Sequence, residues 1–175
     1  MSYLSGKTVY LRAVEPEDLD TLYRYENDPL LWPFGNTLAP YSRFALQEYL
    51  KHAQDDIFQT RQLRLMIVRS DDDRPVGIID LFDFEPHHAR AAVGILVFPG
   101  EQHRGIGSEA LELLSDYAFG VLHLHQLYAH IPESNTFSRR LFSRCGYTEC
   151  GRLNEWLRTA PQQYENVIVV QKTEA

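Results

Sequence analysis

The most constraining feature of this sequence is an apolar, strand-like segment that runs through a glycine-containing turn into a periodic helix. The apolar segment covers residues 91–98, the turn residues 102–108, and the apolar stripe of the helix residues 106–122. A strand that feeds such a helix leaves backbone N–H groups free where the helix dipole is positive. Gly105 and Gly107 lack a Cβ, so phosphate oxygens could approach the main chain closely. This corner therefore predicts a site for a phosphate-bearing ligand.

The turn alone does not identify its ligand, because two glycines at a helix start also occur as plain turn chemistry. A P-loop would need a Gly-Lys-Ser/Thr ending, which this turn lacks. A dinucleotide fingerprint would follow its strand directly and have an acidic residue about 20 positions on. Here residues 99–104 intervene, and the next apolar strand, residues 126–131, contains no carboxylate. A nicotinamide cofactor is therefore disfavoured.

Composition limits the class of protein. With 175 residues, of which 44% are hydrophobic and 12% aromatic, we expect residues 1–175 to form one folded domain. The net charge of −7 disfavours nucleic acid as a partner, whereas an acidic protein attracts cationic substrates. No apolar run approaches the roughly 20 residues of a membrane span, so a cytoplasmic location is expected. Cys145 and Cys150 lack metal-ligand spacing and are expected to be reduced thiols, without a metal site.

Periodicity and turn residues predict the secondary structure. Strands are expected at residues 8–13, 63–70, 76–85, 90–98, 126–131, 148–158 and 163–172. Helices are expected at residues 15–26, 42–57, 106–122 and 136–145, while residues 30–41 are too broken by Pro and Gly for a regular element. We therefore predict an α+β fold with a mixed central sheet of about seven strands and about four helices on its faces. The sheet should be mostly antiparallel, with one parallel pair around the third helix.

The ordered features resemble the GCN5-related N-acetyltransferase (GNAT) family. The matching residues are Gln102-x-x-Gly105-x-Gly107 after a strand, Asn135 at the start of the next helix, and residues 141–147 at its end. The similarity extends from residue 9 to the last strand. Within the family, residues 77–81 and 116–128 are most similar to the branch with spermidine N-acetyltransferases and ribosomal-protein N-terminal acetyltransferases.

The resemblance implies acetyl-CoA as co-substrate, with its pyrophosphate on the turn amides and its pantetheine arm beside the preceding strand. Asn135 matches a family position that contacts that arm. Pantetheine carries amides, so a strand that separates from its neighbour can hydrogen-bond it as an added strand would. The same N–H groups can stabilise an oxyanion on the thioester. The implied acetyl-CoA positions are Ile95, Leu96, Val97, Gln102, His103, Arg104, Gly105, Ile106, Gly107, Ser108 and Asn135.

Acetylation of a primary amine requires removal of a proton, because an amine with a pKa near 10.4 is mostly ammonium at neutral pH. Carboxylates and imidazoles at the end of residues 76–85 are the candidate bases, although such groups also form ordinary solvated rims. The candidates are Asp80, Asp83, Glu85, His87 and His88. Strict alternation puts Asp80 on the face of Phe82 and Asp83 on the other face, so not all of them can point into the site.

Many family members have a tyrosine in the helix of residues 136–145 that protonates the departing thiolate. The matching residue here is Phe142, which has no proton to donate. A thiolate with a pKa near 8.5 is a tolerable leaving group without an acid. Ser138, one turn earlier, could hold a water molecule there, and Tyr128 and Tyr147 are other candidate donors.

The resemblance favours a polyamine such as spermidine as the acceptor. Spermidine acetyltransferases have acids at positions that match Leu38-Ala39 and Ala92 here, so a cationic substrate is not compelled. A protein N-terminus, another small amine, or a non-catalytic acyl-CoA-binding module remain alternatives. The expected partners are acetyl-CoA and an amine, without nucleic acid or membrane, and a homo-oligomer is left open.

Overall fold

The computed structural model describes residues 3–34 and 37–174, and the chain divides into two compact units. The smaller unit is residues 13–56, and the larger contains the remainder of the chain. The prediction of a single domain stays a prediction.

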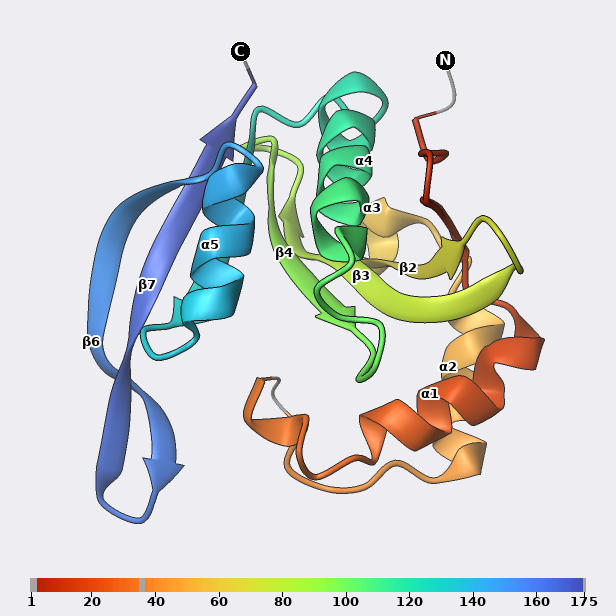
Figure 1. Ribbon diagram of the computed structural model, residues 1–175, viewed down its shortest axis with the longest axis horizontal. Helices are drawn as coiled ribbons and strands as arrows, with labels where there is room; N and C mark the ends of the chain where they lie inside the picture. Colours follow the sequence, from red (N-terminus) through yellow and green to blue (C-terminus); the bar gives the residue numbers. More distant parts are fainter. Residues whose placement is uncertain (1–2, 35–36, 175) are drawn as a thin grey trace. The chain divides into compact units, whose positions relative to one another are not determined.

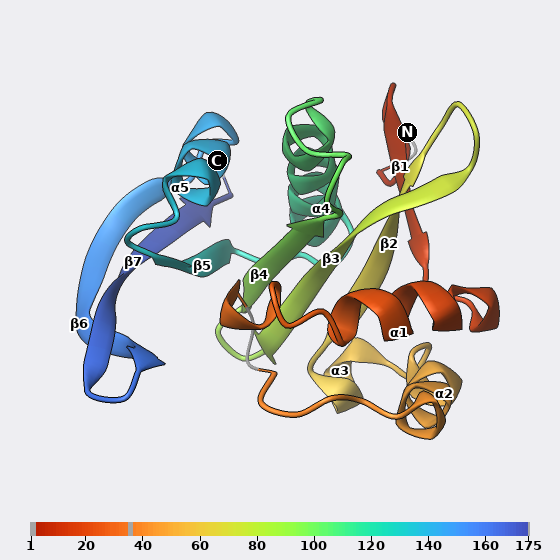
Figure 2. The same ribbon diagram turned by 60° about the horizontal axis from the view of Figure 1, so that its bottom comes forward.

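A seven-stranded mixed sheet organises the larger unit (Figure 1), and its strands follow the order β1-β2-β3-β4-β5-β7-β6 (Figure 2). Its strands are β1 (Val9–Ala13), β2 (Leu63–Arg69), β3 (Arg74–Glu85), β4 (Arg90–Val97), β5 (Gln126–Pro132), β6 (Thr148–Ala160) and β7 (Gln163–Thr173). β2, β3 and β4 form an antiparallel meander, whereas β4 and β5 are parallel. The predicted fold class, with its parallel pair, is confirmed.

The helices of the larger unit are α3 (Ile57–Thr60), α4 (Ile106–Gly120) and α5 (Thr136–Arg144). α4 connects the two parallel strands (Figures 1 and 2). Its Leu111 and Leu114 are completely buried in the core. Each such leucine contributes about 1.5–3 kcal/mol of burial free energy. None of the helices in the described ranges is long and apolar enough to span a membrane.

The smaller unit contains α1 (Leu19–Glu26), α2 (Arg43–His52) and the 3₁₀ turns η1 (Pro16–Asp18) and η2 (Trp32–Phe34). Arg43 links the two helices, because it is paired with Asp20 and its guanidinium lies 4.5 Å from the centroid of the Tyr23 ring. Gly35 and Asn36, within the segment expected to be irregular, lie outside the described residues.

The prediction of one helix over residues 42–57 was wrong. Ser42 does cap α2, accepting a hydrogen bond from the Ala45 amide at 3.0 Å, but α2 ends at His52. The Asp55 amide donates to the His52 carbonyl at 3.0 Å, and the His52 ring lies 3.1 Å from the Asp55 carboxylate. These contacts favour a turn because aspartate competes with helical backbone bonding.

β6 and β7 form a long hairpin at one end of the sheet, with β6 as the edge strand (Figure 1). Their register shifts at three places, between Glu149 and Gly151, between Leu153 and Leu157, and between Arg158 and Ala160. Most of β6 is exposed. The exposed strand β6 therefore adds little to the core, whereas β7 contributes Ile168 and Val170 to it.

Candidate functional site

The parallel strands β4 and β5 pair over only three residues and then separate (Figure 2). The last pair is Ala92 with Tyr128. Residues 93–97 of β4 stay paired with β3, but their other edge has no strand partner in the described parts of the chain. Ile95 and Val97 pack partly against the core cluster. The separation leaves main-chain donors and acceptors of β4 open to an amide-bearing ligand.

The turn after β4 presents its amides in a similar way. Gly105 is the N-cap of α4, has φ of 78°, and makes no side-chain cap. Within residues 3–34 and 37–174, no acceptor takes up the amides of residues 105–108. Such amides at the start of a 15-residue helix are suited to an anion.

The two glycines of the turn serve different purposes. A Cβ added at Gly105 would meet nothing within 4 Å, so the approach to this part of the main chain is open. A Cβ at Gly107 would lie 3.3 Å from Leu141 Cδ2 and 3.5 Å from Val97 Cγ2. Gly107 thus serves close packing between α4, α5 and β4, and Gly105 supplies the left-handed backbone that the turn requires.

Side chains of the turn contact the end of β4, the start of α5 and the preceding loop. Gln102 Nε2 donates to the Val97 carbonyl at 3.3 Å, and the His103 ring packs edge-on against Phe137 at 4.9 Å. Arg104 Nη1 lies 3.3 Å from a carboxylate oxygen of Glu101. The predicted acetyl-CoA positions in the turn are therefore brought together with the end of β4 and the start of α5.

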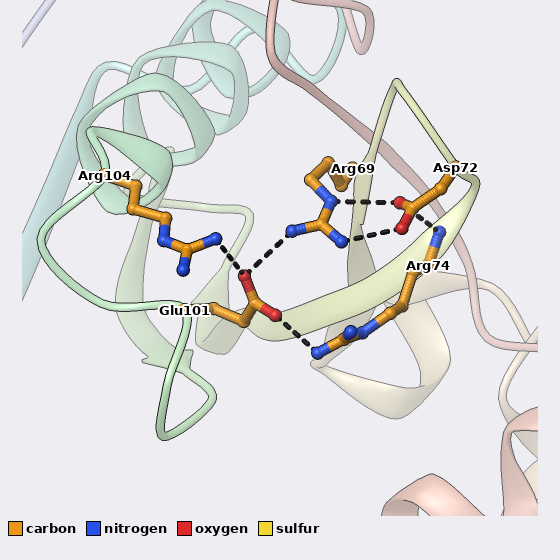
Figure 3. A network of polar contacts seen from close by, with 5 residues as sticks. All are labelled: Arg69, Asp72, Arg74, Glu101 and Arg104. Carbon is orange, nitrogen blue, oxygen red and sulfur yellow. Dashed lines mark hydrogen bonds and ion pairs between the residues drawn. The ribbon is translucent and has the colours of Figure 1, made fainter.

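Glu101, which sequence reasoning passed over, lies at the centre of an ion-pair network (Figure 3). It is only 5% exposed. Its carboxylate accepts hydrogen bonds from Arg74 and Arg104, and from Arg69 at 3.1 Å. No local pattern marks these partners, since Arg74 and Arg69 are 27 and 32 positions away.

Arg69 connects this carboxylate to a second one. Its Nε and Nη2 donate hydrogen bonds to the Asp72 carboxylate at 3.0 and 2.7 Å, while Nη1 donates to Glu101. The Asp72 hydrogen bond is the main cause that raises the pKa of Arg69, and the same bond lowers the pKa of Asp72. The network ties the loop after β4 to the hairpin between β2 and β3.

On the β3 side of the site, Asp80 is engaged in an ion pair. Arg64 Nε and Nη2 donate to its two oxygens at 2.8 and 3.0 Å. Both side chains are mostly buried, at 19% and 18% exposure. Neither oxygen of Asp80 is free to take a proton from an amine without breaking this pair.

Asp83 occupies a bulge in β3, which the alternation argument missed. Its φ is 47°, and the register with β4 shifts between Phe82 and Glu85. Phe84 is consequently turned into the core with Leu81, so strict alternation fails at this point. Burial is the main cause that raises the pKa of Tyr128, and the negative charge of Asp83 raises it further. Asp83 thus acts electrostatically on the strand that diverges from β4.

At the start of α5, Asn135 Oδ1 accepts a hydrogen bond from the Ser138 amide at 3.1 Å and caps the helix. Both side chains are partly exposed. Phe142 is 2% exposed and packs edge-on against Tyr147 at 4.9 Å. The Tyr147 hydroxyl lies 3.2 Å from Ser115 Oγ, and burial raises its pKa strongly. Tyr147 is therefore a core residue rather than an accessible proton donor.

An aromatic row that sequence reasoning did not single out continues from Tyr128. Its ring centroid lies 5.7 Å from that of His130, which lies 6.5 Å from that of Trp156. Trp156 is 58% exposed. His87 and His88 instead pack against each other at 4.7 Å in the turn after β3. In the described part of the chain, Cys145 and Cys150 are free thiols, and no cluster of metal-ligating side chains is present.

Comparisons with known proteins agree with this geometry. The profile of the acetyltransferase (GNAT) domain matches residues 8–148. Spermidine N(1)-acetyltransferase of Escherichia coli K12 is 29% identical over 94% of this chain and 85% of that protein. Spermidine N-acetyltransferase from Vibrio cholerae, in a crystal structure with CoA and spermine, has a TM-score of 0.83 at 26% identity, covering 96% of each chain. A dodecameric structure of spermidine N-acetyltransferase from Vibrio cholerae has a TM-score of 0.78 at 25% identity, covering 96% of this chain and 95% of that chain.

Proposed function

This chain belongs to the GNAT family of acetyltransferases, and we propose that it transfers the acetyl group of acetyl-CoA directly to a polyamine such as spermidine. As a family member it is an acetyl-CoA-dependent N-acetyltransferase, with acetyl-CoA as co-substrate. The observation that carries the proposal is the combination of the unpaired β4 edge with the open turn amides.

In the proposed arrangement the diphosphate binds the turn amides from Gln102 to Ser108. The pantetheine arm lies along Ile95, Leu96 and Val97, with Asn135 on its other side. Supporting this, Asn135 Oδ1 is used by the Ser138 amide, so its side-chain N–H₂ group is the part that can serve the ligand. The β4 amides stabilise the oxyanion that forms when the amine attacks the thioester carbonyl.

Proton removal from the amine is assigned to Asp83 or to a water molecule that it holds. Asp83 is exposed at the bulge of β3 and influences Tyr128, whereas Asp80 is held by Arg64. The departing thiolate needs no strong acid, because its pKa is near 8.5. Water held by Ser138 supplies the proton, since Phe142 cannot and Tyr147 is buried against Ser115.

Polyamine is preferred as the acceptor because the compared acetyltransferases act on spermidine and the chain has a net charge of −7. Trp156 and Tyr128 add aromatic faces that attract ammonium groups. A specific observation favours the alternative of a protein N-terminus. Ala92, which pairs with Tyr128 in β4, and Leu38 provide no carboxylate at positions where spermidine acetyltransferases have acids.

The proposal extends to the organisation of the protein. Residues 1–175 act as one N-acetyltransferase domain in the cytoplasm. They assemble as a homo-oligomer, supported by the dodecameric spermidine acetyltransferase of similar structure.

Release of free CoA thiol from acetyl-CoA tests the function when one amine is supplied at a time. Spermidine, spermine, and peptides that start with Ala or Ser form the panel, with an amine-free reaction as control. We expect the fastest release with a polyamine. Release only with the peptides would reverse the acceptor preference. Thermal stabilisation by acetyl-CoA without release from any amine would instead identify a non-catalytic acyl-CoA-binding module.

A further inference from the structure

We propose that Glu101 is a positioning residue for acetyl-CoA binding. Its buried carboxylate holds the loop of residues 99–104 and the Arg104 guanidinium, so that the turn amides are set for the diphosphate before it arrives (Figure 3). This inference rests on the proposed function, because it assumes that the turn binds the diphosphate.

The loop between β4 and α4 needs such an anchor. Gly100, His103 and Gly105 have φ of 89°, 63° and 78°, so the chain enters the left-handed region three times within six residues. His103 does so with a side chain, which L-residues rarely tolerate unless the surroundings hold them. A backbone that enters the left-handed region at intervals points successive amides toward one side, as in anion-binding nests. Without an anchor the loop would sample other conformations, and ordering it would weaken binding.

Glu101 supplies that anchor from inside the protein. The carboxylate is 5% exposed and joins Arg104, at the end of the loop, to Arg69 and Arg74 of the β2–β3 hairpin. A buried carboxylate with several guanidinium partners is rigid, because each charge-assisted bond is directional and loss of the anion leaves the cations facing one another.

The network also places cations beside the turn. Three guanidinium groups face the carboxylates of Glu101 and Asp72, and Asp71 adds a further negative charge near Arg69, so the cations are held without a net positive charge on the cluster. The side chains of Arg74 and Arg104 are 60% and 59% exposed, so part of each guanidinium is open to solvent. Glu101 thus holds a partly exposed Arg104 guanidinium beside the turn.

Glu101→Gln keeps the shape of the side chain and removes its charge. We expect the dissociation constant of CoA, measured by titration calorimetry, to rise about tenfold, with a matching rise in KM for acetyl-CoA. The kcat at saturating acetyl-CoA and the KM for the amine should change less than twofold. Hydrogen exchange of the amides of residues 100–105 should be faster in the free variant than in the free wild type, and equal to it once both are saturated with CoA.

Asp72→Asn is the matched control, because it breaks the pair with Arg69 but leaves all three contacts of Glu101. It should lower the melting temperature while the CoA dissociation constant stays within twofold of wild type. Arg74→Gln removes one partner of Glu101 from the exposed side and should weaken CoA binding about threefold, which keeps the test available if Glu101→Gln fails to fold.

CoA affinity of Glu101→Gln within twofold of wild type would overturn the inference, as would an equal loss in Asp72→Asn, which would mark the network as a general fold stabiliser. If Glu101→Gln does not fold, wild-type affinity in Arg74→Gln overturns it. A wild-type protein that takes up no CoA would remove the proposed function itself and this inference with it.

Discussion

The two sides of the candidate site use different kinds of chemical group, main chain on one side and side chains on the other. The side proposed for acetyl-CoA is made of main chain: the open edge of β4 and the amides at the start of α4. The amine side is made of side chains, and several candidates there already have partners, as Asp80 has in Arg64 and Tyr147 in Ser115.

This difference determines how firmly each side can be assigned. The open main-chain groups follow from where a strand ends and a helix begins, which local residue types largely determine. A side chain can act on substrate only if it is not already hydrogen-bonded or ion-paired to a neighbour. Such neighbours come from distant parts of the sequence.

Gly105→Val should abolish the binding of the CoA diphosphate by the main chain of the turn. A β-branched residue is strained at φ of 78°, and its side chain would extend into the open space over the turn. Loss of two charge-assisted hydrogen bonds to the diphosphate, at about 2 kcal/mol each, corresponds to roughly a 1,000-fold weaker dissociation constant for CoA.

Gly146→Val is the control for Gly105→Val, since its φ is 85° and a Cβ at this position would meet only the Lys172 side chain, at 3.6 Å. It should destabilise the protein without weakening CoA binding by more than about threefold. An unchanged CoA affinity in Gly105→Val would show that the diphosphate does not use these amides.

Asp83→Asn should impair catalysis, which depends on side chains, without affecting CoA binding, which depends on the main chain. Loss of a general base lowers the rate by about 100-fold at the lower end of the usual range, so kcat/KM for the amine should fall by that factor. CoA binding should not change, because Asp83 lies on β3 rather than on the turn.

Asp80→Asn is the comparison variant. It breaks the Arg64 pair and should cost about 2 kcal/mol of stability, with kcat/KM within about threefold of wild type. The opposite pattern, with Asp80→Asn slow and Asp83→Asn active, would exchange the roles of the two carboxylates.

Tyr147→Phe should have the smallest effect on activity, and it should change the pH dependence of stability only at high pH. The folded protein holds the Tyr147 proton more tightly than the unfolded chain, whose tyrosines ionise near pH 10. The stability that this difference provides is complete below pH 10 and is lost as pH rises through the raised pKa. The wild-type free energy of unfolding should therefore fall above pH 10, by up to about 1.4 kcal/mol per pH unit from this residue.

Denaturant unfolding at successive pH values checks this, and the slope in Tyr147→Phe should be flatter than in wild type. Turnover at pH 7 should be unchanged in the variant. A large loss of kcat at pH 7 would instead return Tyr147 to the list of proton donors.

The sequence was sufficient for most of the fold because strand and helix periodicity are local. The start of α4 at Ile106 and the limits of β2 and β7 agree with expectation to within one residue. What could not be predicted depends on contacts made in three dimensions. The bulge at Asp83 turns Phe84 into the core, and the Phe84 ring also meets the exposed Phe58 ring at 5.2 Å.

The same limit applies to the site. The turn could be predicted from Gly105 and the helix that follows it, because local residue types largely determine the main-chain conformation. Glu101 could not, because its role depends on Arg69 and Arg74 in another hairpin. Nor does the sequence show that Arg64 occupies both oxygens of Asp80, although the two face each other across β2 and β3.

The irregular register of β6 affects how the protein behaves at high concentration. An exposed edge strand of 13 residues would be a template on which further chains could stack into fibrils. The three shifts against β7 bend and twist that edge, so an incoming strand could bond to only short pieces of it. β6 can thus be exposed along most of its length while being a poor seed for aggregation.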